Sequence, residues 1–163
     1  MSTRAYDAGE GITFEIPASF GDPELQSLPD GRKLILAADS ISPDFNVFFV
    51  KTPIQADYNS LGSFGNLDYV GATLLPQCPT RVCSLEQDGI AGRMVEQAST
   101  GGQYIFEYII EQQGQPSRRL RTAMAIAPGK ALLTYTAQCL DSEFDANGST
   151  IRSLVKSFRF NPT

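Results

Sequence analysis

Residues 46–75, NVFFVKTPIQADYNSLGSFGNLDYVGATLL, are the stretch that decides the fold. Over 46–52 both alternating faces carry apolar side chains, which predicts a strand covered on two sides. Pro53 has no N–H to donate to a neighbouring strand, so the pairing should end there. Apolar residues at helical spacing follow the loop, and either Ser63 or Asn66 can cap the helix that they predict. The stretch therefore predicts a strand, a loop and a helix in succession.

The rest of the chain is rich in strand patterns separated by short turns. Residues 18–32 are the exception, because their prolines and Asp-Gly turn signals predict a loop. Short turns between successive strands make neighbours antiparallel. The further predicted strands are 11–17, 33–39, 93–99, 103–112, 118–127 and 131–139.

A second helix is predicted near the C-terminus, where Ile151, Leu154, Val155 and Phe158 form an apolar stripe. Its start has two candidate positions. Residues 142–145 resemble a capping box, whereas Asn147-Gly148 could break the helix and move its start to Ser149. A mainly antiparallel sheet with helices packed on it is an α+β fold. With 163 residues, 42% of them hydrophobic, we expect one domain over 1–163 with its core at about 11–160.

The composition excludes several classes of function. The chain has no histidine, which removes the commonest general base and zinc ligand and rules out histidine-activated serine or cysteine nucleophiles. A net charge of -5 disfavours nucleic-acid binding. Glu107 and Glu111 lie four residues apart on one strand, about 13 Å by strand rise, and we expect them to be solvated. The protein is therefore predicted not to be an enzyme.

Acidic groups offer at most a weak calcium site. One group lies in the 18–32 loop and the other at the start of the last helix, where carboxylates are favourable without any metal. No EF-hand spacing is present. We expect no specific metal site and no cofactor, with weak Ca²⁺ binding as the alternative. The two groups are Asp22, Glu24 and Asp30, and Asp141, Glu143 and Asp145.

Cys78 and Cys83 form a C-x4-C pair, a spacing that can close a small disulfide, and Cys139 is left over. In an oxidising compartment the bridge would fix the loop after the first helix. In a reducing compartment all three would be small apolar residues or idle thiols. A redox-catalytic or zinc role is disfavoured by the spacing and by the number of ligands.

Positive charge is sparse but clustered, including Arg152, Lys156 and Arg159 near the C-terminus. Such clusters suit a face that docks on an acidic partner. The competing interpretation is that they protect an edge strand or stabilise a helix C-terminus. The candidate partner-binding residues are Arg118, Arg119, Arg121, Arg32, Lys33 and Lys156.

The order of motifs in 46–75 resembles the PsbP family, the extrinsic lumenal subunits and assembly factors of photosystem II and its neighbours. GITFEIP at 11–17 is similar to the family's opening strand, QYIFEY at 103–108 to its central strand, and GKALLT at 129–134 to a later one. LVKSFRF at 154–160 resembles its terminal helix running into Ser-Phe. The resemblance implies an α-β-α sandwich with a central, mainly antiparallel sheet.

The resemblance also implies a non-catalytic protein of the chloroplast thylakoid lumen. Such a protein would bind the photosystem II core and other extrinsic subunits, support the oxygen-evolving complex with Ca²⁺ and Cl⁻ retention, and be monomeric in isolation. It would be peripheral to the membrane through protein contacts. An assembly factor for photosystem I or II is the alternative, and the same sandwich also occurs in GTPase-binding and envelope proteins.

The N-terminus and the cysteines depart from the main plant subunit. No transit peptide precedes the first predicted strand, so the targeting sequence has been removed or the protein is cytosolic. About ten residues precede that strand, fewer than in the plant subunit, whose longer N-terminal extension is credited with ion retention, so truncation is an open alternative. No lipid-box cysteine lies near Met1. The C-x4-C pair and the lack of histidine favour a divergent algal member.

Overall fold

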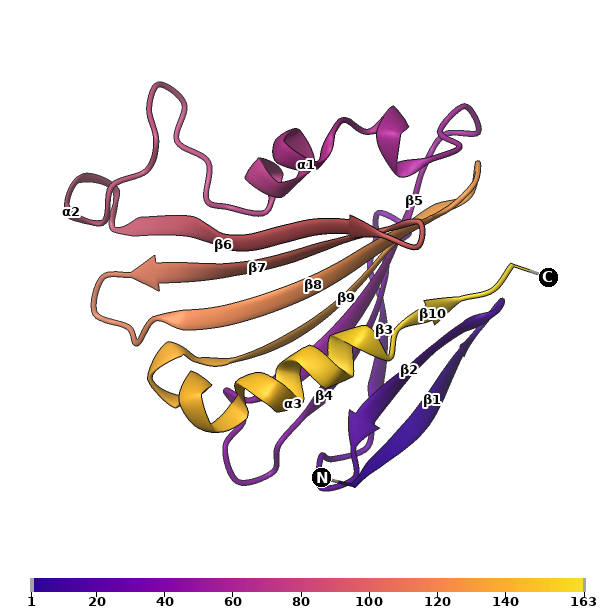
Figure 1. The fold of residues 1–163 in the computed structure, drawn as a ribbon, viewed down its shortest axis with the longest axis horizontal. Coiled ribbons are helices and arrows are strands. Elements are labelled where there is room, and N and C mark those ends of the chain that lie inside the picture. The colour runs from indigo at the N-terminus through magenta and orange to yellow at the C-terminus, as the bar shows by residue number, and fades with distance from the viewer. Residues whose placement is uncertain (1, 163) are drawn as a thin grey trace.

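The computed structural model describes residues 2–162 and is built on a seven-stranded sheet in which every neighbouring pair is antiparallel (Figure 1). The strand order is β3-β4-β5-β9-β8-β7-β6. Two runs of consecutive strands, β3 to β5 and β6 to β9, therefore meet where β5 pairs with β9. The strands are β3 (Glu24–Ser27), β4 (Lys33–Ala38), β5 (Asn46–Pro53), β6 (Ile90–Thr100), β7 (Gln103–Gln112), β8 (Arg118–Ala127) and β9 (Ala131–Leu140).

A smaller sheet has the order β1-β2-β10 and joins the strands from the N-terminal part of the described chain to a strand from its C-terminal part (Figure 1). It consists of β1 (Thr3–Gly9), β2 (Ile12–Pro17) and β10 (Arg159–Phe160). The backbone N–H of Glu15 in β2 donates to the Ser157 hydroxyl at 2.9 Å, just after the last helix. The small sheet and that helix thus form one layer.

Helical segments lie on both faces of the large sheet (Figure 1). The helix α1 and the turns around it cover one face, and α3 covers the other together with the small sheet. This arrangement confirms the predicted α+β class and the α-β-α layering. The helical segments are η1 (Leu61–Ser63), α1 (Leu67–Thr73), α2 (Leu85–Asp88), η2 (Asp141–Glu143) and α3 (Phe144–Lys156).

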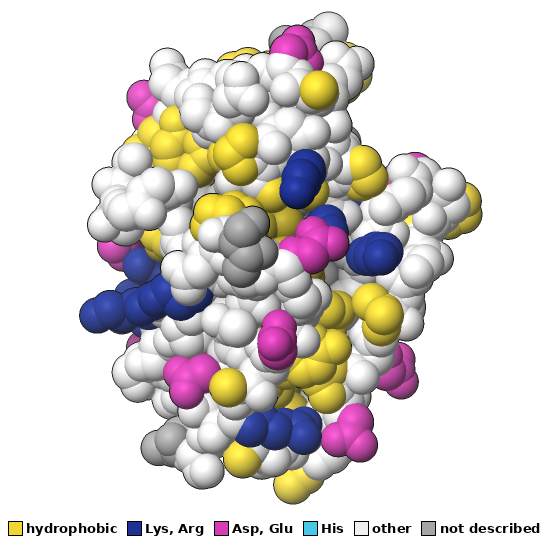
Figure 2. All heavy atoms as spheres, turned by 90° about the vertical axis from the view of Figure 1, so that its right-hand side faces the viewer, with side chains coloured by type: hydrophobic (Ala, Val, Ile, Leu, Met, Phe, Trp, Pro, Cys, Tyr) yellow, Lys and Arg dark blue, Asp and Glu magenta, His cyan; other side chains and the backbone are white. Residues whose placement is uncertain are grey.

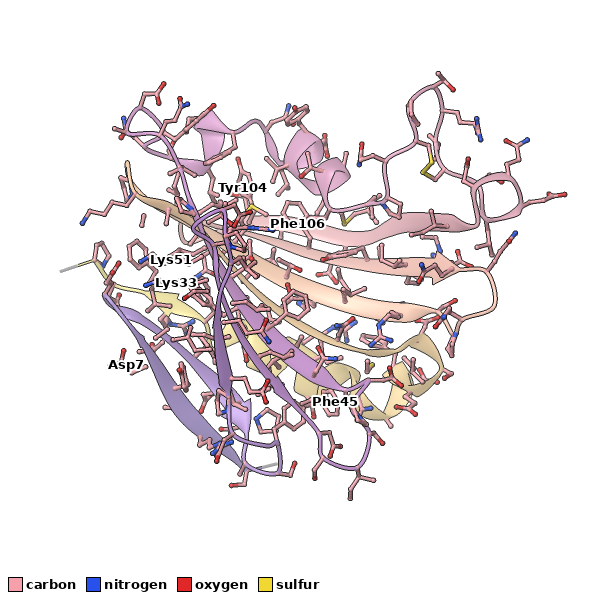
Figure 3. The ribbon with its side chains drawn as sticks, turned by 180° about the vertical axis from the view of Figure 1, so that it is seen from behind. Asp7, Lys33, Phe45, Lys51, Tyr104 and Phe106 are labelled. Carbon is pink, nitrogen blue, oxygen red and sulfur yellow. A yellow bond between two sulfur atoms is a disulfide. The ribbon has the colours of Figure 1, made fainter. Side chains whose placement is uncertain are left out.

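Each face of the sheet has its own apolar core. On the α3 side, the ring of Phe14 stacks on Tyr135 with centroids 4.3 Å apart, and the Tyr135 hydroxyl donates to the Glu15 carbonyl at 2.6 Å. On the α1 side, Phe106 is fully buried beside Tyr104, and both lie beneath the segment that carries α1 (Figure 3). Alternation along β7 supplies both cores from one strand.

Most predicted elements are confirmed with small shifts at their ends, including 103–112 and 118–127 without change. The α1 cap is Asn66, whose side chain accepts from the Tyr69 N–H. Two predictions were wrong. The supposed loop 18–32 contains β3, whose residues are all exposed, so no burial alternation marked it. The strand at 11–17 is also not the first strand, contrary to the prediction, because β1 precedes it and pairs with it along most of its length.

The last helix starts within the predicted 142–145 segment, although no side-chain cap hydrogen bond forms there, and the alternative start at Ser149 was wrong. A 3-10 turn at Asp141–Glu143 leads into α3, which begins at Phe144 and runs through Asn147-Gly148. A Cβ built at Gly148 would lie 2.9 Å from the Phe144 ring. A larger side chain at this position would collide with the ring, which explains why a glycine lies in the interior of this helix.

Within the part of the chain that the structure describes, no helix is long and apolar enough to cross a membrane. The expectations about Met1 lie outside the described residues.

Candidate functional site

A groove of about 680 Å³ lies between the C-terminal half of α3, the β6–β7 turn and the faces of β7 and β8. Four of its lining side chains are cationic and none is acidic. Ile105, which is only partly buried, adds apolar surface. The lining residues are Thr100, Gly101, Gln103, Ile105, Arg121, Arg152, Ser153, Val155, Lys156 and Arg159.

Beside this groove, Glu107 is completely buried, with a relative exposure of 0%. Its carboxylate accepts hydrogen bonds from Arg119 Nη2 at 2.9 Å and Arg121 Nη1 at 3.0 Å. The Nε atom of Arg152 in α3 lies 3.4 Å from the same carboxylate. A buried charge needs partners of this kind, because isolation from water is costly.

The register of the sheet explains why these groups meet. Glu107 on β7 lies directly opposite Arg121 on β8 and Glu96 on β6. Arg119, two positions from Arg121, projects from the same face. Each of these two arginines reaches a second carboxylate, Arg121 to Glu96 at 3.5 Å and Arg119 to Asp141 at 3.4 Å. Three strands, α3 and the η2 turn therefore build a connected ionic network, which we call the Glu107 cluster: Glu107, Arg119, Arg121, Arg152, Glu96 and Asp141.

Two opposing effects act on the pKa of Glu107. Burial raises it, whereas hydrogen bonds from Arg119 and Arg152 and their positive charges lower it. The second effect prevails, so the pKa of this carboxyl lies below its ordinary value and the group is ionised at neutral pH.

Phe144 anchors the cluster from the first turn of α3. The Arg119 guanidinium lies 4.2 Å from the centre of its ring, and that of Arg152 lies 5.2 Å away. Cations are attracted to the electron-rich face of an aromatic ring. The ring that requires Gly148 thus also orients two of the three arginines around Glu107.

The outer part of the groove carries unneutralised positive charge. Within residues 2–162, neither Lys156 nor Arg159 forms an ion pair. Figure 2 shows Lys and Arg side chains gathered at the left edge of the face, the side on which α3 lies, while elsewhere basic, acidic and hydrophobic groups are interspersed. A protein of net charge -5 thus has a local basic surface along α3.

The structure brings together only some of the predicted partner-binding residues. Arg121 and Lys156 line the groove, and Arg119 belongs to the Glu107 cluster. Arg118 points to the other face of the sheet and pairs with Asp44 at 2.9 Å. The interpretation of these arginines as edge-strand protection was wrong, because β8 lies between β7 and β9.

The other two predicted basic residues lie on or beside β4. Arg32 pairs with Asp30 at 2.7 Å. Lys33 lies opposite Lys51 on β5, and Figure 3 shows the two side by side. Lys51 in turn pairs with Glu10 at 2.8 Å. These residues do not line the groove, and their part in partner binding stays a prediction.

The expectation that Glu107 is solvated was wrong. It lies between Ile105 and Ile109 on the face that α3 covers, and the arginines of β8 replace water around it. Glu111, on the same face, is partly exposed. The sequence contained a signal for this difference, because Arg119 and Arg121 on the next predicted strand share one face. The roles of Arg152 and Phe144 had no such signal, since the position of α3 over the sheet was unknown.

Three of the six acidic residues considered for calcium pair with arginines. Asp22 pairs with Arg4 at 3.3 Å, Asp30 with Arg32 and Asp141 with Arg119. Among residues 2–162, the metal-ligating atoms that converge belong to Cys78, Cys83 and Asp88. The two cysteines there are joined to each other, which leaves no thiolate for a metal.

Cys78 and Cys83 form a disulfide with Cα atoms 5.3 Å apart, visible in Figure 3 as the yellow bond. It closes the loop between α1 and α2. Cys139 is free and buried, and burial raises the pKa of its thiol to about 11. The free thiol is therefore protonated and unreactive at neutral pH.

Comparison with solved structures places the fold among known ones. The chain is similar to cyanobacterial PsbP (CyanoP) from Synechocystis sp. PCC 6803, with a TM-score of 0.72 and 20% identity over 98% of this chain and 93% of that one. The Ran-binding protein Mog1p of Saccharomyces cerevisiae has a TM-score of 0.56 and 12% identity, over 99% and 97%. LpqN, involved in cell envelope biogenesis of Mycobacterium tuberculosis, has 0.53 and 13%, over 98% and 92%. At these identities the likenesses show the fold alone.

Sequence comparison is more specific. The chain is 28% identical over 144 residues to PsbP domain-containing protein 3, chloroplastic, of Arabidopsis thaliana. The match covers 83% of this chain and 56% of that protein, so the chain spans little more than half the length of this relative. The family model PsbP matches residues 1–160. This chain therefore belongs to the PsbP family.

Proposed function

We propose that this protein acts by binding, as a non-catalytic extrinsic protein of the chloroplast thylakoid lumen that docks on photosystem II. In this role one PsbP-like domain, monomeric in isolation, contacts the photosystem core and neighbouring extrinsic subunits through its surface. It stabilises the oxygen-evolving complex and helps retain Ca²⁺ and Cl⁻. The observation that carries the proposal is the PsbP family match over residues 1–160.

Three further observations support the proposal. The Arabidopsis relative is named as chloroplastic. Without histidine, the chain lacks the group that most often serves in acid-base catalysis. The groove along α3 presents several positive charges, which favour association with an acidic surface. Membrane attachment through protein contacts needs no hydrophobic anchor of its own.

Reconstitution tests the proposal directly. Photosystem II membranes washed with high salt to remove extrinsic proteins are incubated with the purified protein, pelleted and assayed for bound protein. Oxygen evolution is then measured at low and at high CaCl₂. We expect saturable binding that is reversed by salt, and a gain in oxygen evolution confined to low CaCl₂. No saturable binding, with oxygen evolution unchanged at low CaCl₂, would contradict the proposal.

Fractionation of native thylakoids separates a stable subunit from an assembly factor. We expect the protein to migrate with mature, oxygen-evolving photosystem II. Migration with assembly intermediates of photosystem I or II would assign it to assembly instead. A stable cytosolic pool would contradict both roles.

A further inference from the structure

We infer that the groove between α3 and the β6–β7 turn is a binding site for an extended acidic peptide segment of a partner protein. The inference deepens the proposed function and rests on it, because it names the docking chemistry of the photosystem contact. The residues assigned to carboxylate binding are Arg121, Arg152, Lys156 and Arg159.

Charge is the first argument. The groove is lined by four cationic side chains and no acidic one, on a protein whose net charge is -5. Arg121 pairs with Glu107 and Glu96, and Arg152 shares Glu107, whereas Lys156 and Arg159 have no carboxylate partner among residues 2–162. The uncompensated charge of the groove therefore lies at Lys156 and Arg159. Charges in a recess interact more strongly than on an open surface, because less water screens them.

Shape selects a peptide chain over a membrane surface. The Arg121 side chain is only 15% exposed, so a flat lipid surface cannot reach it. An extended peptide is narrow enough to enter. A volume of about 680 Å³ is in the range of sites that hold molecules much larger than a single phosphate. Ile105, which is only partly buried, provides apolar contact for an aliphatic residue between two acidic ones.

The site is also preorganised. The Glu107 cluster holds the guanidinium groups of Arg121 and Arg152 in place. Arg159 Nη1 donates to the carbonyl of Phe158 at 2.9 Å and to that of Lys156, which keeps its side chain along the end of α3. A ligand that meets groups already in position loses less conformational entropy on binding.

Fluorescence anisotropy with a short fluorescein-labelled peptide, in which glutamates alternate with leucine and glycine, tests the inference. The groove variant is Lys156→Gln with Arg159→Gln, which leaves the Glu107 cluster intact. The control is Arg93→Gln with Lys130→Gln, which removes the same charge from exposed positions outside the groove. Circular dichroism and thermal melting confirm that both variants fold.

We expect wild type and control to bind the peptide alike and the groove variant to bind about tenfold more weakly, as for the loss of two charge pairs in a partly screened site. The glutamine version of the peptide should not bind. Equal weakening in both variants would overturn the inference, because binding would then follow total charge. It would also be overturned by undetectable binding to wild type, by complete competition from inorganic phosphate at low millimolar concentration, or by binding only to phosphatidylglycerol vesicles.

Repeating the photosystem II binding assay with the same variants separates this inference from the proposed function. Loss of photosystem II binding in the groove variant, but not in the control, supports both the groove inference and the proposed function. Undiminished binding of the groove variant overturns the groove while the proposed function stands. Peptide binding by wild type without photosystem binding overturns the proposed function and leaves the groove's specificity intact.

Discussion

Replacing the buried carboxylate by its neutral isostere, Glu107→Gln, should destabilise the protein. Glutamine keeps the shape and one acceptor oxygen, so the substitution removes charge without leaving a cavity. Three guanidinium groups, from Arg119, Arg121 and Arg152, would then face one another without their shared anion.

The magnitude follows from the exposure of these groups. Breaking a buried pair by removing one partner costs about 3–5 kcal/mol. Here the cost is lower, because the Arg152 side chain is 50% exposed and Arg119 and Arg121 each retain a second carboxylate. We expect a loss of about 2–3 kcal/mol in the free energy of unfolding, which for a chain of this size lowers the Tm by about 5–10 °C.

Urea unfolding followed by circular dichroism measures the change, and an unchanged m-value would show that the folded state keeps its compactness. Glu111→Gln is the matched control, since it makes the same substitution on the same face of β7 at a partly exposed position. The control should remain within about 0.5 kcal/mol of wild type. If Glu107→Gln matched the control or were more stable than wild type, desolvation would outweigh the ion pairs and the reasoning would be refuted.

Three further predictions follow from the same contacts. The pKa of Glu107 is lowered in the folded protein, so its contribution to stability is present above the unfolded pKa of about 4.3 and is lost as pH falls through the folded value. The difference in unfolding free energy between wild type and Glu107→Gln should therefore close below about pH 4, and a difference that stayed constant to pH 2 would contradict this. Gly148→Ala should destabilise the wild type, because the added Cβ would meet the Phe144 ring at 2.9 Å, but should stabilise a Phe144→Ala variant by about 0.5–1 kcal/mol through helix propensity. Additive effects of the two substitutions in a double-mutant cycle would count against that contact. Reduction of the Cys78–Cys83 bridge should lower the free energy of unfolding by about 2 kcal/mol, as expected for so short a loop. Cys139 should resist iodoacetamide at pH 8 in the native protein, because its thiol is buried with a pKa of about 11, and rapid labelling without unfolding would contradict this.

Elements with internal alternation or clear caps were predictable from the sequence. The strand at 103–112 and the helix cap depend on short-range patterns; the strand was found where predicted, and the cap is Asn66, one of the two predicted candidates. β3 was missed because a fully exposed edge strand has no apolar period. Gly148 was misjudged because its place in a helix depends on the Phe144 ring that lies over it, a contact that the turn-forming Asn-Gly pair did not reveal.

The candidate site was predictable only in part, for a similar reason. Arg119 and Arg121 were identified as a shared face, but whether they point to a partner or to a buried carboxylate depends on what covers Glu107. That cover is α3, whose place over the sheet is set by tertiary packing. Local sequence thus identified the charged groups, and the layer arrangement decided which of them remain available to a ligand.

The three-stranded sheet has a consequence for folding. β10 pairs with β2, so a strand near the C-terminal end of the described residues completes a sheet begun by strands near their N-terminal end. Contacts between such distant segments form late in folding, because the entropy cost of closing a long stretch of chain comes before the contacts can stabilise it. The apolar side chains of β2, Ile12, Phe14 and Ile16, are buried in the same core as α3, so their burial also waits for the C-terminal part of the described chain to pack.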